Sequence, residues 1–221
     1  MPLDPPTNYG VVLFPGFQAL DVFGPLDVLN ILSRHRKLTL SILASSLDPV
    51  STKHGFTSSP TSNFGESVMP THTFTKPPED LEVLLVPGGF GTRDEQEMGA
   101  VRPFIKDCYP KLRYLLTVCT GSAVVARTGI LDGKKATSNK KSWARATAQG
   151  PNVEWVPKAR WVVDGNIWTS SGITAGMDLI YAFVGQVYSQ EVAEDIANAS
   201  EYERHLDPSD DPFAEVWKAG A

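Results

Sequence analysis

The segment Thr117-Val118-Cys119-Thr120-Gly121 places a cysteine where a nucleophile could act. The apolar run RYLLTV, residues 113–118, predicts a buried strand, and a helix is expected to begin at the cysteine. A nucleophile at such a junction lies on a tight turn that pushes its side chain out at the sheet edge. Small residues two positions before and after allow the turn to close. Gly121 meets this requirement, and Thr117 meets it only in part.

The ionisation state of the Cys119 thiol is the second question that the segment raises. The N-terminus of a helix favours a thiolate, because its dipole and free N–H groups stabilise negative charge. The alternative is that Cys119 is simply a small buried apolar residue. Spacing alone leaves both interpretations open.

Two glycines follow a neighbouring apolar run and could stabilise charge. The run LEVLLV, residues 81–86, predicts a strand that ends at Pro87-Gly88-Gly89. Backbone N–H groups at Gly88 and Gly89 would be unobstructed, which suits an oxyanion hole shared with the N–H of Thr120. Taken alone, however, a Pro-Gly-Gly sequence is usually an ordinary turn.

Asp21 supplies an acid near the end of the first predicted strand, within LDVFGP, residues 20–25. That position puts it at the carboxyl edge of a parallel sheet, the same edge as Cys119 and the edge where open α/β sheets bind ligands. Asp is also a preferred helix N-cap residue, and position alone favours that second interpretation. Asp27, further along, is expected on the exposed side of the helix.

The remaining cysteine and the histidines give weaker indications of a catalytic role. Cys108 lies at a predicted helix end and is interpreted as structural. His35, His54 and His72 belong to no recognisable motif. His205-Leu206-Asp207 could complete a cysteine triad, but it lies in a polar, proline-broken tail, so no catalytic role is expected.

Apolar periodicity predicts strands alternating with helices and therefore an α/β fold with a mostly parallel sheet covered on both faces. Residues 45–78 are rich in Ser, Thr, Pro and Gly and predict short strands and loops. Asp164-Gly165 predicts a hairpin turn. The predicted strands are 9–14, 38–44, 81–86 and 113–118, with a hairpin over 161–170; the predicted helices are 22–32, 94–108, 119–128, 141–149, 174–187 and 190–202.

Composition narrows the class of protein. The 221 residues are 42% apolar and 20% charged, which fits one globular domain over 1–221, with a core of about 8–200 and a surface tail at 201–221. A net charge of −5 argues against nucleic-acid binding, and the lysines of 134–141 are expected to be solvated. Two cysteines without metal-site spacing suggest a reducing compartment. No signal peptide or membrane span is expected, so a cytoplasmic protein is the default.

Four segments together resemble the DJ-1/PfpI superfamily, within the class I glutamine amidotransferase-like proteins, and are most similar to isocyanide (isonitrile) hydratases. They are FPGFQALDVFGPLDVL (14–29), LLVPGGFGT (84–92), TVCTGSAVVARTGILDGKKAT (117–137) and VVDGNIWTSSGITAGMDL (162–179). The resemblance implies a flavodoxin-like three-layer sandwich and a homodimer. It implies a small-molecule substrate and no metal or organic cofactor.

The same resemblance implies roles for individual residues. Cys119 matches the nucleophile and Thr120 its neighbour, while Asp21 matches a carboxylate that hydrogen-bonds near the thiol. Gly89 matches a backbone donor. The segment beside the cysteine contains Gly172 and Ile173.

One position departs from the superfamily pattern. Many relatives have a histidine where this chain has Asn139, and asparagine cannot act as a general base at neutral pH. A cysteine–histidine mechanism is therefore not expected, whereas isocyanide hydration to an N-substituted formamide can use Asp21 instead. The alternatives are a DJ-1-like glyoxalase or deglycase, and a thiol sensor whose Cys119 is oxidised. A ligand-binding regulator is disfavoured, because only about 40 residues follow Asp178.

Overall fold

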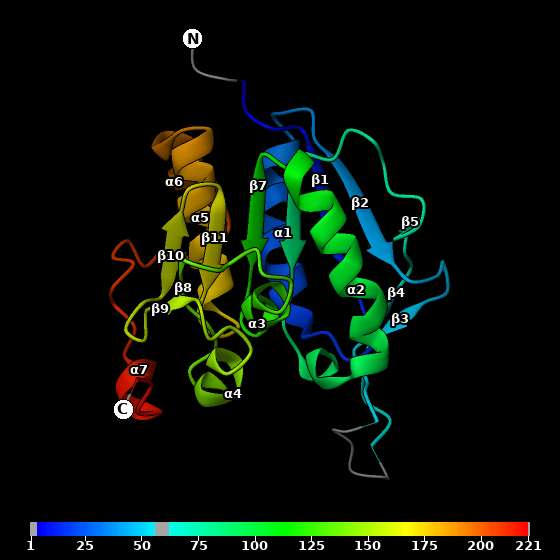
Figure 1. The fold of residues 1–221 in the computed structure, drawn as a ribbon. Helices are drawn as coiled ribbons and strands as arrows, with labels where there is room; N and C mark the ends of the chain where they lie inside the picture. The colour runs from blue at the N-terminus through cyan, green and yellow to red at the C-terminus, as the bar shows by residue number, and fades with distance from the viewer. Residues whose placement is uncertain (1–3, 56–61, 221) are drawn as a thin grey trace.

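A seven-stranded sheet forms the centre of the protein in the computed structural model, which describes residues 4–55 and 62–220 (Figure 1). The strand order is β10-β11-β7-β6-β1-β2-β5. All neighbouring pairs are parallel except β10 with β11, which form an antiparallel hairpin. The strands are β1 (Asn8–Val12), β2 (Thr39–Ala44), β5 (His72–Thr73), β6 (Val83–Val86), β7 (Tyr114–Thr117), β10 (Trp161–Asp164) and β11 (Ile167–Ser170).

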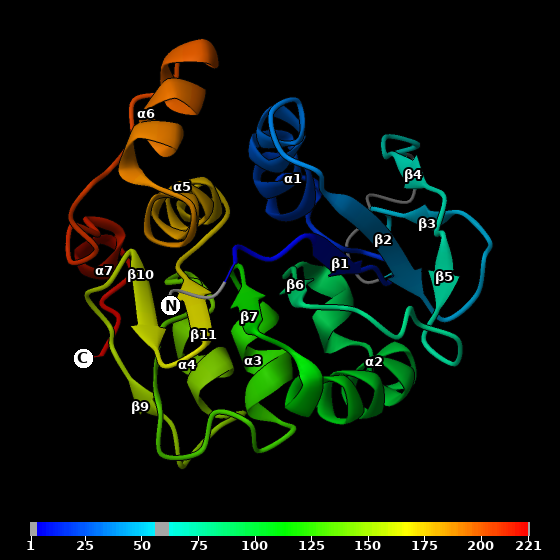
Figure 2. The same cartoon turned by 90° about the horizontal axis from the view of Figure 1, so that it is seen from above.

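Helices cover both faces of this sheet. Figure 2 shows α1, α5 and α6 on one side of the sheet and α2 and α3 on the other. The two layers bury β6 completely, which explains why its sequence is a continuous apolar run rather than an alternating one. The helices are α1 (Ala19–Ser33), α2 (Glu95–Cys108), α3 (Gly121–Ala126), α4 (Trp143–Thr147), α5 (Ala175–Val187), α6 (Gln190–Ala199) and α7 (Phe213–Val216), with short 3-10 helices η1 (Phe90–Arg93) and η2 (Tyr109–Lys111).

The α/β class with a mostly parallel sheet is confirmed, as are all of the predicted strands and helices to within a few residues. The register brings the carboxyl ends of β1, β6 and β7 to one edge, because Val11 pairs with Leu85 and Leu85 with Leu116. None of the helices in the described ranges is both long and apolar enough to cross a membrane. The short strands expected within residues 45–78 are confirmed by a small sheet of β3 (Val50–Ser51) with β4 (Ser67–Val68), whereas the small sheet of β8 (Lys135–Ala136) with β9 (Glu154–Trp155) was not predicted.

Two expectations about surface segments were wrong. The tail does not merely lie over the surface, because the Asp211 side chain is fully buried. The Lys140 side chain, expected in solvent, is 1% exposed and lies 3.4 Å from the Asp211 carboxylate. The ion pair between Lys140 and Asp211, which are far apart in the sequence, therefore anchors the tail. The composition of the two segments does not predict this pair.

Candidate active site around Cys119

Cys119 lies on the predicted tight turn, two residues beyond β7 and two before α3. Its φ of 58° is in the left-handed region, which non-glycine residues rarely occupy. Three hydrogen bonds hold the turn: the Cys119 N–H donates to the Ser171 carbonyl at 3.0 Å, and the Cys119 carbonyl accepts from the hydroxyls of Ser122 and Ser138, each at 3.1 Å. Strained backbone fixed in this way is typical of functional sites.

The small-residue requirement of this turn is confirmed at Gly121. A Cβ added there would lie 2.2 Å from the Val86 carbonyl oxygen, so only glycine fits between the turn and β6. Thr117, which meets the requirement only in part on the other side of the turn, is fully buried. Because Gly121 has no side chain, the start of α3 can pack against the backbone of β6, and the turn can close.

Asp21 is not a helix cap, so the interpretation that its position favoured was wrong. Gln18 is the N-cap residue of α1, and Asp21 lies in the first helical turn with a fully buried side chain. Its Oδ2 accepts a hydrogen bond of 2.9 Å from the Gly88 N–H. No N–H or O–H of the described residues donates to its buried Oδ1. The sheet therefore places this carboxylate at the same edge as Cys119. Its Oδ2 is bonded to Gly88, and its Oδ1 is available to accept a proton.

Asp21 and Cys119 influence each other's ionisation. Burial raises the pKa of Asp21 to about 7, while the Gly88 N–H and the Cys119 thiol partly oppose this by stabilising the carboxylate. Burial, together with the negative charge of Asp21, raises the pKa of the Cys119 thiol to about 12. The N–H of Thr120 at the start of the helix does favour the thiolate, as expected, but desolvation of the buried sulfur outweighs it. At neutral pH the residue is a thiol beside an acid that titrates.

Three donors nevertheless surround the sulfur. The backbone N–H groups of Thr120 and Ile173 and the side chain of Asn139 hydrogen-bond to Cys119 and lower the pKa of its thiol. Ile173 has a φ of 41°, an outlier for a β-branched residue. Gly172 lets Asn139 approach, because a Cβ added at Gly172 would lie 2.5 Å from the Asn139 Nδ2. Asn139, noted in the sequence only as a departure, is thus a site residue.

The two glycine N–H groups already have partners within the site. Gly88 donates to Asp21, and Gly89 donates to the Thr120 hydroxyl at 3.1 Å. A Cβ at Gly88 would lie 2.6 Å from the Thr120 nitrogen, which explains the need for glycine there. The oxyanion-hole interpretation of Gly89 therefore requires that its N–H leave Thr120, whereas the Thr120 and Ile173 N–H groups already point at the sulfur.

A pocket of about 270 Å³ opens over Cys119. This volume is close to the lower end of the range for small-molecule sites. The described residues contain no group of three or more His, Cys, Asp or Glu side chains able to hold a metal ion. The pocket is lined by Gln18, Gly89, Phe90, Arg93, Cys119, Thr120, Asn139, Lys141, Ser142 and Ile173.

A model of the DJ-1/PfpI family matches residues 10–186, which include every element that builds this site. The chain belongs to the DJ-1/PfpI family. The flavodoxin-like arrangement that the sequence resemblance implied is therefore confirmed.

Relatives within the family differ in activity. An isonitrile hydratase from Pseudomonas putida is 35% identical over 87% of this chain and 77% of its own length. A deglycase from Pyrococcus horikoshii is 31% identical over 53% of this chain and 69% of its own. A solved structure of a THiJ/PfpI family protein from Pseudomonas syringae superposes with a TM-score of 0.73. It is 31% identical and covers 92% of this chain and 78% of that one.

His205 does not complete a triad in this DJ-1/PfpI protein. Its Nδ1 lies 3.4 Å from the Asp178 carboxylate, and its backbone N–H donates to the same side chain at 3.0 Å. Asp178 is also bonded to the Arg160 guanidinium at 2.6 Å. His205 is therefore an exposed side chain that pairs with the buried Asp178 and does not line the Cys119 pocket, in line with the expectation from sequence.

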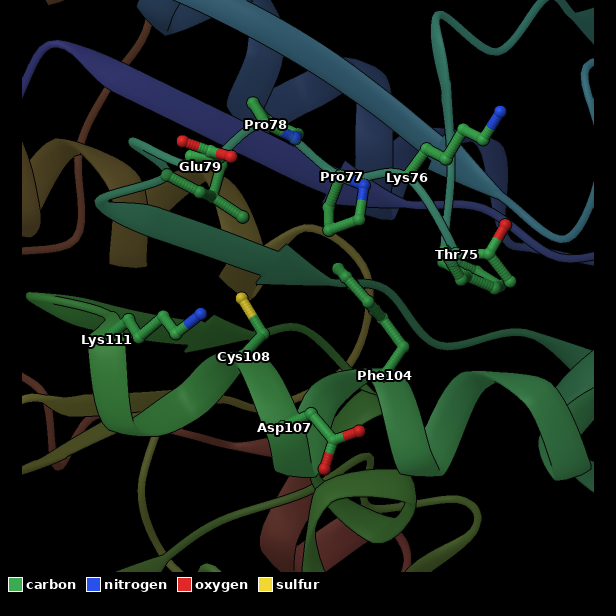
Figure 3. A pocket seen from close by; sticks show the side chains of 11 residues that line it. Thr75, Lys76, Pro77, Pro78, Glu79, Phe104, Asp107, Cys108 and Lys111 are labelled. Carbon is green, nitrogen blue, oxygen red and sulfur yellow. The ribbon is translucent and has the colours of Figure 1, made fainter.

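Cys108 lies in a different pocket, and its surroundings differ from those of Cys119. Figure 3 shows its side chain at the end of α2, with Asp107 and Lys111 nearby and Phe104 one turn earlier. Burial raises the pKa of its thiol to about 11, and the charge of Lys111 only partly opposes this. Neither a strained turn nor a buried carboxylate accompanies it, which supports the structural interpretation of Cys108.

The loop that carries Asn139 is anchored by its neighbour Lys140. The Lys140 ammonium donates to the Thr137 hydroxyl at 2.6 Å and to the Ala159 carbonyl at 2.9 Å, in addition to its pairing with Asp211. Burial lowers the pKa of Lys140 to about 8, and the Asp211 charge partly restores it. The C-terminal tail therefore helps to fix the wall of the pocket.

Replacing Asp211 with alanine should destabilise the protein by roughly 3–5 kcal/mol, because the buried Lys140 cation would lose its counter-ion. Urea unfolding followed by circular dichroism measures this loss. The matched control is Glu215→Ala, which removes the partner of Lys158 in an exposed pair. Its effect should stay below about 1 kcal/mol. Equal effects of the two substitutions would contradict the anchoring role of Asp211.

Proposed function

We propose that this protein is a cysteine-dependent isocyanide hydratase, which converts R–N≡C and water into the formamide R–NH–CHO. The observation that carries the proposal is the buried pair of Cys119 and Asp21. The thiol is protonated at rest, and Asp21 is the charged group that shifts its pKa most. Such a pair suits a substrate whose reacting carbon takes up both the sulfur and the proton.

In the first step the sulfur attacks the terminal carbon of the isocyanide as Asp21 removes the thiol proton. Asp21 then delivers that proton to the same carbon, which gives the thioimidate R–N=CH–S–Cys119. The N–H groups of Thr120 and Ile173 and the amide of Asn139 stabilise negative charge on the sulfur during the transfer. The atoms and electrons of this step balance without a cofactor.

In the second step water adds to the thioimidate carbon. Asp21 accepts a proton from the water, and the imine nitrogen gains one, which gives R–NH–CH(OH)–S–Cys119. Loss of the hydroxyl proton and cleavage of the carbon–sulfur bond release the formamide, and the departing sulfur recovers its proton through Asp21. The site returns to its starting state after one water is consumed.

The raised thiol pKa also bears on the alternatives. An oxidation sensor and a glyoxalase that attacks a carbonyl both benefit from a resting thiolate, and burial opposes that thiolate here. The deciding experiment assays purified protein with alkyl isocyanides and with methylglyoxal, detecting formamide or loss of glyoxal by chromatography. Formamide production with little glyoxal turnover is expected. Glyoxal turnover without formamide would refute the hydratase assignment.

The pH dependence follows from Asp21. Because the carboxylate must accept the thiol proton, the protonated acid is inactive, so kcat/KM should rise about tenfold per pH unit below about 7 and level off above it. Initial rates between pH 5 and 9 measure this profile. A kcat/KM that falls as the pH rises through 7 would contradict the role of Asp21 as proton acceptor.

We also propose that the protein is a homodimer, as the family resemblance implies. Leu20 and Phe23 on α1 are apolar and substantially exposed, which supports a covered surface there. Light scattering at micromolar concentration should give twice the chain mass. A monomer mass would contradict the proposal.

A further inference from the structure

The charged side chains that line the Cys119 pocket are both cationic. Among the described residues that line it, Arg93 and Lys141 are the only charged ones, and no acidic side chain joins them. The whole chain has a net charge of −5, so this local excess of positive charge runs against the overall balance. A pocket with this lining attracts anions.

Neither cation is neutralised by a carboxylate in the described part of the chain. The Arg93 guanidinium lies 4.6 Å from the centre of the Phe90 ring, and the Lys141 ammonium lies 5.4 Å from the Trp217 ring. These aromatic contacts hold the long side chains at the pocket and leave their donors unoccupied by any acid. Guanidinium and ammonium groups in this state are suited to bind a carboxylate.

Further arginines reinforce the positive field. Burial lowers the pKa of Arg145, and the nearby charges of Arg93 and Arg127 lower it further. The charge of Arg127 is balanced by Glu95, to which its Nη2 donates at 3.0 Å. The charge of Glu95 partly offsets this effect at Arg145 as well, so Arg93 is the member of this arginine group that lines the pocket without a carboxylate partner among the described residues.

We propose that the site selects isocyanides that bear a carboxylate, with Arg93 and Lys141 as specificity-determining residues that bind it. The isocyanide carbon is directed to the Cys119 sulfur, and the substituent extends past Phe90 and Ile173 toward the two cations. A volume of about 270 Å³ limits the substituent to a small one. This assignment of substrate class rests on the proposed isocyanide hydration, and its test separates the two.

The first arm compares kcat/KM for isocyanoacetate and for its neutral methyl ester. The wild-type protein should prefer the acid, and Arg93→Gln combined with Lys141→Gln should lower the acid-to-ester ratio at least tenfold. The matched control, Arg34→Gln with Lys37→Gln, removes two exposed charges at the far end of α1 and should leave the ratio unchanged. Turnover of the ester with no preference for the acid would overturn the inference and leave the hydratase proposal intact.

The second arm does not depend on isocyanide turnover. Iodoacetate and iodoacetamide each alkylate a thiol by forming a sulfur–carbon bond, expelling iodide and releasing the thiol proton to solvent; only iodoacetate is anionic. In a Cys108→Ser background, mass spectrometry gives the iodoacetate-to-iodoacetamide rate ratio at Cys119. The ratio should fall about tenfold in the Arg93/Lys141 double variant and not in the control. An unchanged ratio, or no alkylation by iodoacetate, would overturn the inference.

Discussion

Replacing Cys119 with alanine should reduce isocyanide turnover to the rate of the protein-free control. In the proposed mechanism the Cys119 sulfur forms the bond to the isocyanide carbon, and the other cysteine lies in a different pocket, away from Asp21. Formamide release measured by chromatography over several hours checks this. Cys108→Ser, which leaves the turn at Cys119 untouched, should retain wild-type turnover.

The Cys119→Ala variant should remain folded, because alanine meets the same cost as cysteine at a φ of 58°. Its circular dichroism spectrum and melting temperature are the required checks. Cys119→Ser provides a second variant that also preserves a polar group beside Asp21. Formamide production by either folded variant would show that the cysteine is not the nucleophile.

Replacing Asp21 with asparagine should lower turnover about a hundredfold to ten-thousandfold, the usual contribution of a general acid–base group. Asparagine has nearly the same volume, and its carbonyl oxygen can still accept the Gly88 N–H. It cannot take the thiol proton. The rise of kcat/KM with pH should also disappear. Asp27→Asn, an exposed position on the same helix, is the control and should have wild-type activity.

Stability should respond to Asp21→Asn in the opposite direction from activity. The pKa of Asp21 is raised in the folded state, so ionisation of the buried carboxylate destabilises the native protein as the pH rises from about 4 to 7. Asparagine carries no such charge, and the variant should therefore melt at or above the wild-type temperature at pH 8. A lower melting temperature together with normal turnover would show that Asp21 is structural.

The sequence by itself determined the order of the strands and helices and the turn at Cys119. These features depend on local patterns: a fully apolar run predicts a strand buried on both faces, and Gly121 permits the sharp start of α3. The small strands β8 and β9 could not be predicted, because each has two residues and exists only through pairing with the other.

Only the tertiary structure decided where the site residues lie and what surrounds them. Asp21 looked like a helix cap until the sheet placed it beside Gly88 and Cys119, residues far from it in the chain. The state of the thiol depends on desolvation by the surrounding layers, which exceeds the local effect of the helix N-terminus.

The tertiary structure also decided the surroundings of the lysines that were expected at the surface from the composition of their segment. Lys140 is buried because a carboxylate from the tail reaches it, whereas Lys141, the next residue, faces the pocket together with Arg93. Adjacent lysines in a polar segment look alike in sequence. Long-range packing alone separates an anchor from a side chain that can bind substrate, because electrostatic energies depend on burial and distance rather than on position in the chain.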